Sequence, residues 1–328
     1  MLFWHPARVA AQALVLLPAL FPNAPVDPLG LVTEAPTRTE HSVPYSAGTV
    51  QADIYHPSDH DPHGAVILLL GAGDLPRSDV AVHFAEALAR LGVVVMMPNT
   101  RGMLEERLTF DEVDAVRASV NLLREQPNVD PARIGLVGLS ASGGLSIVAA
   151  AQPDLRDEVR FVNSFGSYFD ATQLLLEVAS RSIEVDGQVR PWQPDQRTQD
   201  VVAIALRSGP PSGAADELIA GTTRERAKEL IAQLPEATRA KLKEVSPSTY
   251  LSQLKAHLYL MHDEDDPFIP FTQSRALNAA APAGIVSKFT EFSIFAHVIP
   301  ERPVPLQTFV PDLWRLFWHV QSVLMEVL

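Results

Sequence analysis

The stretch RIGLVGLSASGG, residues 133–144, decides the fold of this 328-residue chain. It starts as an apolar run typical of a strand buried on both faces, and the small residues of Leu145–Ala151 after it suit a helix. Between them Ser140 occupies a G-x-S-x-G turn in which Ser142 replaces the last glycine. Such a turn lifts the hydroxyl above the sheet and points the first helical amides at developing charge. We therefore interpret Ser140 as a nucleophile, since serine is small enough for that glycine's place.

The same turn has simpler interpretations as a packing turn or a phosphate loop. A phosphate loop would end in Gly-Lys-Ser/Thr, and no lysine is near. A dinucleotide-binding turn would follow the first strand of the sheet, whereas this one follows the third core strand that we predict. The nucleophile interpretation is therefore favoured over both.

Composition narrows the function classes. The chain is 47% hydrophobic, which is ample for a core, and its net charge of −13 would repel a phosphate backbone. It has no cysteine, which excludes disulfides, thiolate metal sites and a cysteine nucleophile. We expect no nucleic-acid partner.

The hydrophobic pattern predicts an α/β fold with a doubly wound, mostly parallel sheet. A hairpin over Thr39–Ser46 and Thr49–Tyr55 precedes the alternating elements. Core strands are expected at 65–70, 93–97, 134–137, 159–164, 257–261 and 286–292, and helices at 80–91, 110–126, 275–281 and 312–327.

The alternation stops from Tyr168 to Val245, where no strand is convincing and four segments look helical: 199–207, 214–220, 224–234 and 237–244. We therefore predict a core of residues 38–167 and 246–328, interrupted by a helical cap over 168–245.

Residues 1–22 are apolar and carry one formal side-chain charge, on Arg8. Their densest part, Val9–Phe21, is short for a membrane span and suits a signal h-region, and the stretch from Pro22 to Pro36 resembles a linker. An uncleaved anchor or export signal, a docked helix and a cleaved signal peptide remain open. An anchored or exported protein, associated with a membrane through residues 1–22, is favoured over a cytoplasmic one.

A serine nucleophile needs a base and an acid, which in a sheet of this kind follow in the order Ser, Asp or Glu, His. HDEDDPFIP at 262–270 follows one late strand, and SIFAHV at 293–298 follows the last core strand. His297 therefore stands where the base is required.

At this point the chain resembles the α/β-hydrolase family, most closely its dienelactone-hydrolase and esterase-like branch, over about residues 45–328. The resemblance rests on VDPARIGLVGLS at 129–140, NTRG at 99–102 and DDPFIP at 265–270. It implies that the catalytic acid lies four residues before Pro270, at Asp266, with Asp265 and then Asp263 as alternatives. Asp263 stands where the family carries glycine. His262 is expected to be structural or to line the pocket.

The resemblance also places an oxyanion loop at LGAGD, residues 70–74, where Leu70 replaces the family's frequent histidine. The chemistry requires backbone amides, so Ala72 and Ala141 are the expected donors, with Gly73 as an alternative to Ala72. The cap is expected to supply much of the acyl or alcohol pocket, with Tyr168 and Trp192 as walls.

Together these features predict a serine hydrolase of carboxylic esters, acting on a small-molecule substrate through an acyl-enzyme, with no metal and no cofactor. An amidase or exopeptidase and a lipase working at an interface share the triad and stay open. The departures at Leu70, Ser142 and Asp263 leave a fourth interpretation, an interaction protein on a hydrolase scaffold.

Overall fold

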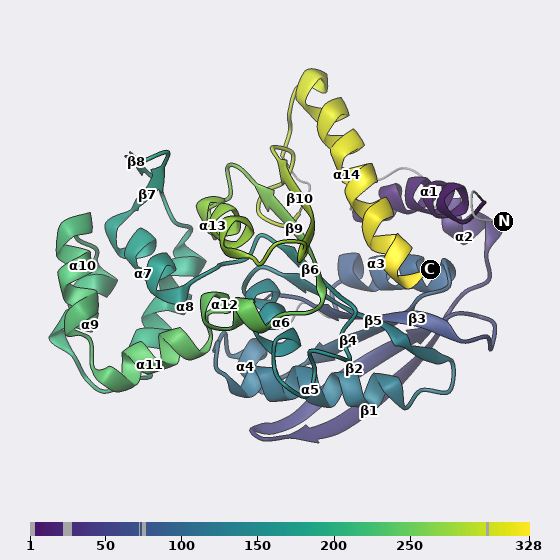
Figure 1. Cartoon of the computed structure of the whole chain (residues 1–328), viewed down its shortest axis with the longest axis horizontal. Helices are drawn as coiled ribbons and strands as arrows, with labels where there is room; N and C mark the ends of the chain where they lie inside the picture. Colours follow the sequence, from purple (N-terminus) through teal and green to yellow (C-terminus); the bar gives the residue numbers. More distant parts are fainter. Residues whose placement is uncertain (1–3, 22–27, 72, 74–76, 300–301) are drawn as a thin grey trace.

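The computed structural model describes residues 4–21, 28–71, 73, 77–299 and 302–328 (Figure 1). Its centre is an eight-stranded sheet in the order β1-β2-β4-β3-β5-β6-β9-β10. The hairpin of β1 and β2 is antiparallel, β2 also pairs antiparallel with β4, and the remaining neighbours are parallel. The strands are β1 (Thr37–Tyr45), β2 (Gly48–His56), β3 (His63–Leu69), β4 (Val94–Asn99), β5 (Val129–Leu139), β6 (Phe161–Phe165), β9 (His257–Asp263) and β10 (Val286–Phe292).

Helices cover both faces of the sheet because the central strands carry apolar side chains on both sides. The cluster on one face includes buried residues of α5 (Asp111–Arg124), α6 (Ala141–Ala150) and α13 (Thr272–Ala280). The cluster on the other face includes α3 (Asp79–Arg90), the N-terminal helix α1 (Trp4–Leu16) and the C-terminal helix α14 (Leu306–Val327). The short helices α2 (Pro28–Val32), α4 (Arg101–Leu104), α12 (Pro247–Tyr250) and the 3₁₀ turns η1 (Leu17–Leu20) and η2 (Leu251–Gln253) connect these elements.

The segment between β6 and β9 is mostly helical and extends beyond the end of the sheet (Figure 1). Its helices pack around a small apolar cluster of their own. They are α7 (Ala171–Ser180), α8 (Gln196–Arg207), α9 (Gly213–Ala220), α10 (Arg224–Gln233) and α11 (Glu236–Glu244). The expectation of no strand here is wrong: β7 (Ser182–Val185) and β8 (Gln188–Pro191) form a hairpin around Gly187, whose positive φ of 74° favours glycine.

The N-terminal helix is docked on the body of the protein. Val9, Ala13 and Leu16 recur at helical spacing and are buried in the cluster that contains α3 and α14. Of the three possibilities that the sequence left open, these contacts are those of a docked helix. The sequence favoured an anchor or export segment, because an apolar stripe does not by itself reveal which surface receives it. Residues 22–27 of the expected linker lie outside the described residues, and α2 occupies the part that follows.

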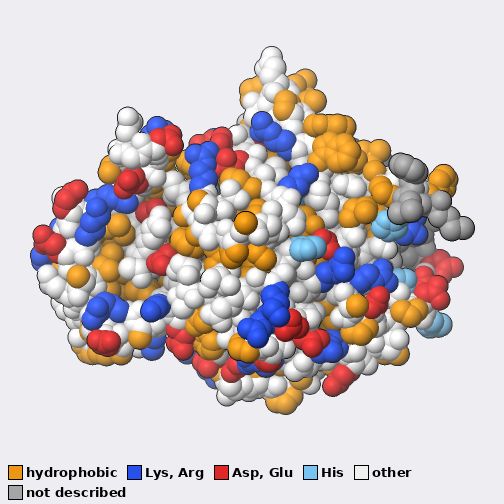
Figure 2. All heavy atoms as spheres, in the orientation of Figure 1, with side chains coloured by type: hydrophobic (Ala, Val, Ile, Leu, Met, Phe, Trp, Pro, Cys, Tyr) orange, Lys and Arg blue, Asp and Glu red, His pale blue; other side chains and the backbone are white. Residues whose placement is uncertain are grey.

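Helix α14 buries one face and exposes another. Leu316, Leu324 and Val327 are buried, whereas Trp314 and Trp318 stand out on the surface, where Figure 2 shows hydrophobic side chains over this helix. Within the described part of the chain, no helix combines the length and apolar character needed to cross a membrane.

Candidate active site

Ser140 lies at the sharp junction of β5 and α6, with φ 56° and ψ −134°. A positive φ is strained for a residue with a Cβ, and such strain clusters at functional sites. Its amide donates to the carbonyl of Phe165 at 2.8 Å, which fixes the turn against β6. Gly71 packs closely against the turn, because a Cβ at position 71 would lie 3.1 Å from the Cβ of Ser140, a tight contact.

Small residues flank the turn because strand and helix nearly touch. A Cβ on Gly138 would lie 2.6 Å from the Cα of Gly143, and a Cβ on Gly143 would lie 2.6 Å from the hydroxyl of Ser164. Ser142, which replaces the usual glycine, fits here and its hydroxyl donates to the Leu70 carbonyl at 2.7 Å. Ser142 thus ties the helix to the end of β3.

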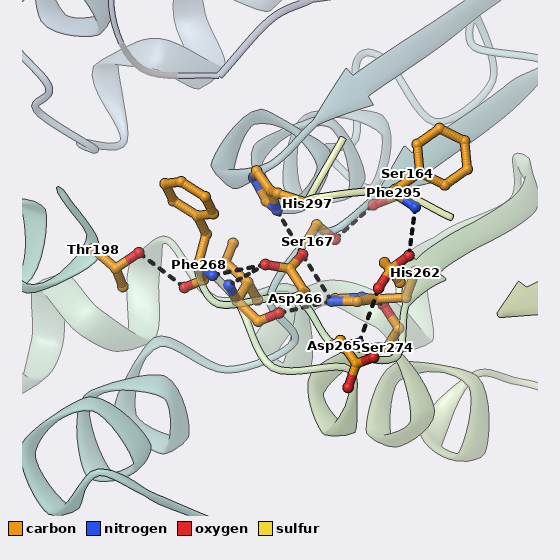
Figure 3. Close-up of polar contacts among 12 residues, drawn as sticks. Ser164, Ser167, Thr198, His262, Asp265, Asp266, Phe268, Ser274, Phe295 and His297 are labelled. Atoms are coloured by element: carbon orange, nitrogen blue, oxygen red, sulfur yellow. Dashed lines mark hydrogen bonds and ion pairs between the residues drawn. The ribbon is translucent and has the colours of Figure 1, made fainter. Parts of the chain in front are cut away.

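His297 and Asp266 are in contact. Nδ1 of His297 lies 2.5 Å from Oδ2 of Asp266 (Figure 3), and the ring must donate because a carboxylate only accepts. The other ring nitrogen, Nε2, is buried and has no hydrogen-bond partner among the described residues. Because Nδ1 carries the proton that is donated to Asp266, Nε2 is available as a proton acceptor. The backbone of His297 also has a positive φ, 67°.

Asp266 is held ionised despite its burial. Burial raises the pKa of this carboxyl, but the charge of His297 and hydrogen bonds from His262 and His297 outweigh it and hold the pKa below its usual range. Its other oxygen accepts from the amides of Phe268 at 2.7 Å and Ile269 at 3.0 Å. These bonds orient the carboxylate toward the imidazole.

The two alternative acids point elsewhere. Asp265 is exposed to solvent and pairs with Arg302 at 2.6 Å. Asp263 is buried and accepts from the amides of Asp265 at 2.9 Å and Phe295 at 2.8 Å, so it joins the loop of Asp266 to the loop of His297. Burial raises the pKa of Asp263 to about 6.

His262 lies beneath the acid loop rather than in the cavity. Its Nε2 is 2.8 Å from the Ile269 carbonyl and 3.4 Å from Asp266, and its Nδ1 is 2.5 Å from the hydroxyl of Ser274. The ring therefore fastens the loop to α13.

The expected oxyanion donors are only partly described. Ala72 lies outside the described residues. Gly73 is excluded as a free donor, because its amide already bonds the Met103 carbonyl at 2.9 Å. Ala141 is the first residue of α6, where helix geometry leaves amides without a partner inside the helix.

Of the two aromatic residues expected as pocket walls, one lines the cavity. Tyr168 lines the cavity, and its hydroxyl donates a hydrogen bond to the Val245 carbonyl at 2.8 Å. Trp192 does not: its indole donates to the Asp266 carbonyl at 3.0 Å, so it supports the acid loop from outside, a correction to its expected role. Phe268, which the sequence did not single out, stacks its ring on His297 at 4.7 Å between centroids. The sequence signal that could have identified Phe268 is its position two residues after Asp266, in the same loop as the acid.

A cavity of about 960 Å³ joins these residues. Ser140, Ala141 and His297 line it together with residues of α8 and α11, so the segment between β6 and β9 contributes to its wall. Apolar residues dominate the lining, as is usual for small-molecule sites.

Comparison with known proteins identifies the family. The family model described as BD-FAE, an α/β-hydrolase-type esterase domain, matches residues 52–281. No curated protein matches the chain.

Several solved structures have similar folds. The 2,6-dihydroxy-pseudo-oxynicotine hydrolase is 17% identical with a TM-score of 0.57, over 88% of this chain and 69% of that one. Est1E from Butyrivibrio proteoclasticus is 12% identical with a TM-score of 0.53, over 88% and 98%. An acylaminoacyl peptidase from Pyrococcus horikoshii is 15% identical with a TM-score of 0.57, over 92% and 43%, so this chain spans less than half of its length. These likenesses confirm the α/β-hydrolase fold that the sequence predicted.

Proposed function

Because the chain belongs to the BD-FAE family, we propose that it is a serine hydrolase of carboxylic esters, with Ser140 as nucleophile, His297 as base and Asp266 as orienting acid. The observation that carries the proposal is the contact of His297 with Asp266, because His297 lines the same cavity as Ser140. Spacing along the chain and the contact of His297 with Asp266 both support this proposal.

In the proposed reaction, Nε2 of His297 takes the proton of the Ser140 hydroxyl while the oxygen attacks the ester carbonyl carbon. The carbonyl oxygen gains the negative charge, which the amide of Ala141 and, as we propose, that of Ala72 stabilise. Collapse breaks the bond to the alcohol, which leaves with the proton from His297. Water, activated by the same imidazole, then hydrolyses the acyl-enzyme.

The charge of Asp266 supports both halves of this cycle. The carboxylate holds Nδ1 protonated, which makes Nε2 the basic nitrogen, and it stabilises the imidazolium that forms. Its lowered pKa keeps it ionised over the range in which histidine titrates.

The nucleophile can be tested with two neighbouring serines as a matched pair. Ser140→Ala is expected to lower kcat/KM for p-nitrophenyl butyrate by about 10⁴-fold or more and to abolish labelling by a fluorophosphonate. Ser142→Ala, which removes the bond to Leu70, should keep labelling and most of the turnover. Loss of labelling in Ser142→Ala with retention in Ser140→Ala would reject the assignment.

The reaction class is tested by leaving group. We expect turnover of p-nitrophenyl esters and little turnover of the matching p-nitroanilides. Faster cleavage of the anilides would indicate an amidase or peptidase. If fluorophosphonate does not label the protein and neither the esters nor the anilides are cleaved, the protein would instead be an interaction protein on this scaffold.

A further inference from the structure

The cavity at Ser140 has two arms. One, the cap arm, lies toward Val201, Val202 and Leu242 of the cap. The other, which we call the roof arm, passes between the sheet and the helices α1, η1, α3 and α14. Its lining includes Val66, Leu68, Val137, Leu16, Val323 and Val327.

The strand pattern explains why the roof arm is apolar. Val66, Leu68 and Leu70 are alternate residues of β3 and its end, so they point to one face of the sheet. Val137 and Leu139 do the same on β5. On the opposite side, helical residues such as Leu16 complete the wall.

The polar side chains in this wall are already bonded to protein atoms. His319 lies 2.9 Å from Asn163 and 2.8 Å from Thr290, and burial lowers the pKa of His319 to about 3, so the ring is neutral at pH 7. Ser78 accepts from the Ala81 amide at the start of α3. Among the described residues no charged side chain lines the roof arm. Its walls therefore suit a hydrocarbon chain.

The length of the arm can be read from the elements beside it. From Leu70 to Val66 a strand covers roughly 13 Å, at about 3.3 Å per residue. From Leu316 to Val327 a helix covers roughly 16 Å, at about 1.5 Å per residue. Bonds of about 1.5 Å at angles near 111° advance an extended chain about 1.25 Å per carbon, so the arm accommodates about ten to thirteen carbons.

We propose that the roof arm binds the aliphatic chain of a medium- to long-chain acyl group whose carbonyl carbon is attacked by Ser140. This inference rests on the proposed function and names its substrate class: esters of fatty acids of about ten to thirteen carbons. The acyl chain is assigned to this arm because it stays attached to the serine through both half-reactions, whereas the alcohol must leave before water attacks.

The test compares acyl chains in solution below their micelle concentrations. We expect kcat/KM for p-nitrophenyl esters to rise about fourfold per methylene from butyrate to decanoate. Val323→Phe, which narrows the arm from α14, should lower the ratio of kcat/KM for laurate to that for butyrate by at least about tenfold. Val310→Phe is the matched control, since Val310 is exposed on the same helix and lies outside the cavity wall.

Val201→Phe in the cap arm is the competing variant. If Val201→Phe lowers the laurate-to-butyrate ratio and Val323→Phe leaves it unchanged, the acyl chain lies under the cap and the proposal is wrong. Sensitivity of dodecyl acetate, but not p-nitrophenyl laurate, to Val323→Phe would place the alcohol in the roof arm and would also overturn it.

A binding measurement separates this proposal from the proposed function. Dodecanoate at about 100 times its Kd should stabilise the Ser140→Ala protein against thermal unfolding, and Val323→Phe should weaken the binding at least about tenfold. If Val323→Phe weakens dodecanoate binding but the wild-type protein cleaves no ester, the roof arm is a binding site for aliphatic chains and the proposed hydrolase function is wrong. If the wild-type protein cleaves esters but dodecanoate binds equally well with and without Val323→Phe, the hydrolase function holds and the proposed role of the roof arm is wrong. Should Val323→Phe fail to fold, Ala81→Leu narrows the same arm from α3.

Discussion

Asp265 and Asp266 are adjacent carboxylates in opposite surroundings. Asp266 is buried beside His297 with two amides on its free oxygen, whereas Asp265 faces solvent and Arg302. An exposed ion pair of this kind contributes little to stability. Position in the loop therefore distinguishes two residues that sequence composition makes equivalent.

We expect Asp266→Asn to lower kcat by roughly 10²- to 10⁴-fold, because the imidazole loses its tautomer and its charge partner. Asp265→Asn, the same change one residue earlier, should alter kcat less than about threefold. Steady-state kinetics on p-nitrophenyl butyrate measures both. The reverse ranking would move the acid by one residue.

The sequence anticipated much of this residue-level geometry. Counting from Pro270 selected Asp266, and strand order selected His297; the structure brings the two side chains together. The sequence did not predict the contact of Phe268 with His297 or the position of Trp192 outside the cavity, because the direction of an aromatic ring depends on packing between loops. Nor did it reveal that Asp263 bridges the two loops where the family carries glycine.

Among the elements, α1 shows that a hydrophobic pattern predicts a helix but does not predict what the helix packs against. Its buried stripe and its apolar character were visible in the sequence, but a stripe that docks on α14 has the same spacing as one that enters a membrane. The core strands could be predicted because buried parallel strands are continuous apolar runs. The β7–β8 hairpin was missed because it is short and half exposed.

The docking of α1 predicts a difference between two neighbouring positions. Ala13 is fully buried and Leu14 is 62% exposed on the other side of the helix. Ala13→Asp should bury an unpaired charge and lower the melting temperature by more than about 5 °C, whereas Leu14→Asp should change it by less than about 2 °C. Calorimetry on the full-length chain measures both values. Equal, small shifts would show that α1 contributes little to the fold.

At the scale of the whole molecule, cap and core are joined by a buried polar cluster. Glu177 of α7 accepts from Gln273 at 2.6 Å and Thr272 at 3.2 Å, both on α13. The Gln273 side chain in turn accepts from the amides of Phe169 and Asp170, where the chain leaves the core. Burial raises the pKa of Glu177, although these hydrogen bonds oppose the rise.

This cluster makes stability depend on pH in a defined direction. A carboxyl whose pKa is raised on folding stabilises the fold below its unfolded pKa, and that stability is lost as pH rises through the folded pKa. Glu177→Gln, which cannot ionise, should therefore gain stability relative to the wild type between pH 4 and pH 8. Urea unfolding at both pH values measures the change, with exposed Glu236→Gln in the cap as the control. A difference independent of pH would mean that Glu177 titrates as it does in the unfolded chain.

The roof arm also bears on how the protein is made. Leu16 and Leu316 line the same cavity although they are 300 residues apart in the chain. At about 5 to 20 residues per second, a ribosome adds α14 some 15 to 60 seconds after α1. Throughout that interval the apolar stripe of α1 lacks the helix that covers it, so the nascent chain displays a hydrophobic helix of the kind that chaperones bind. The roof arm is thus among the last parts of the protein to be completed during synthesis.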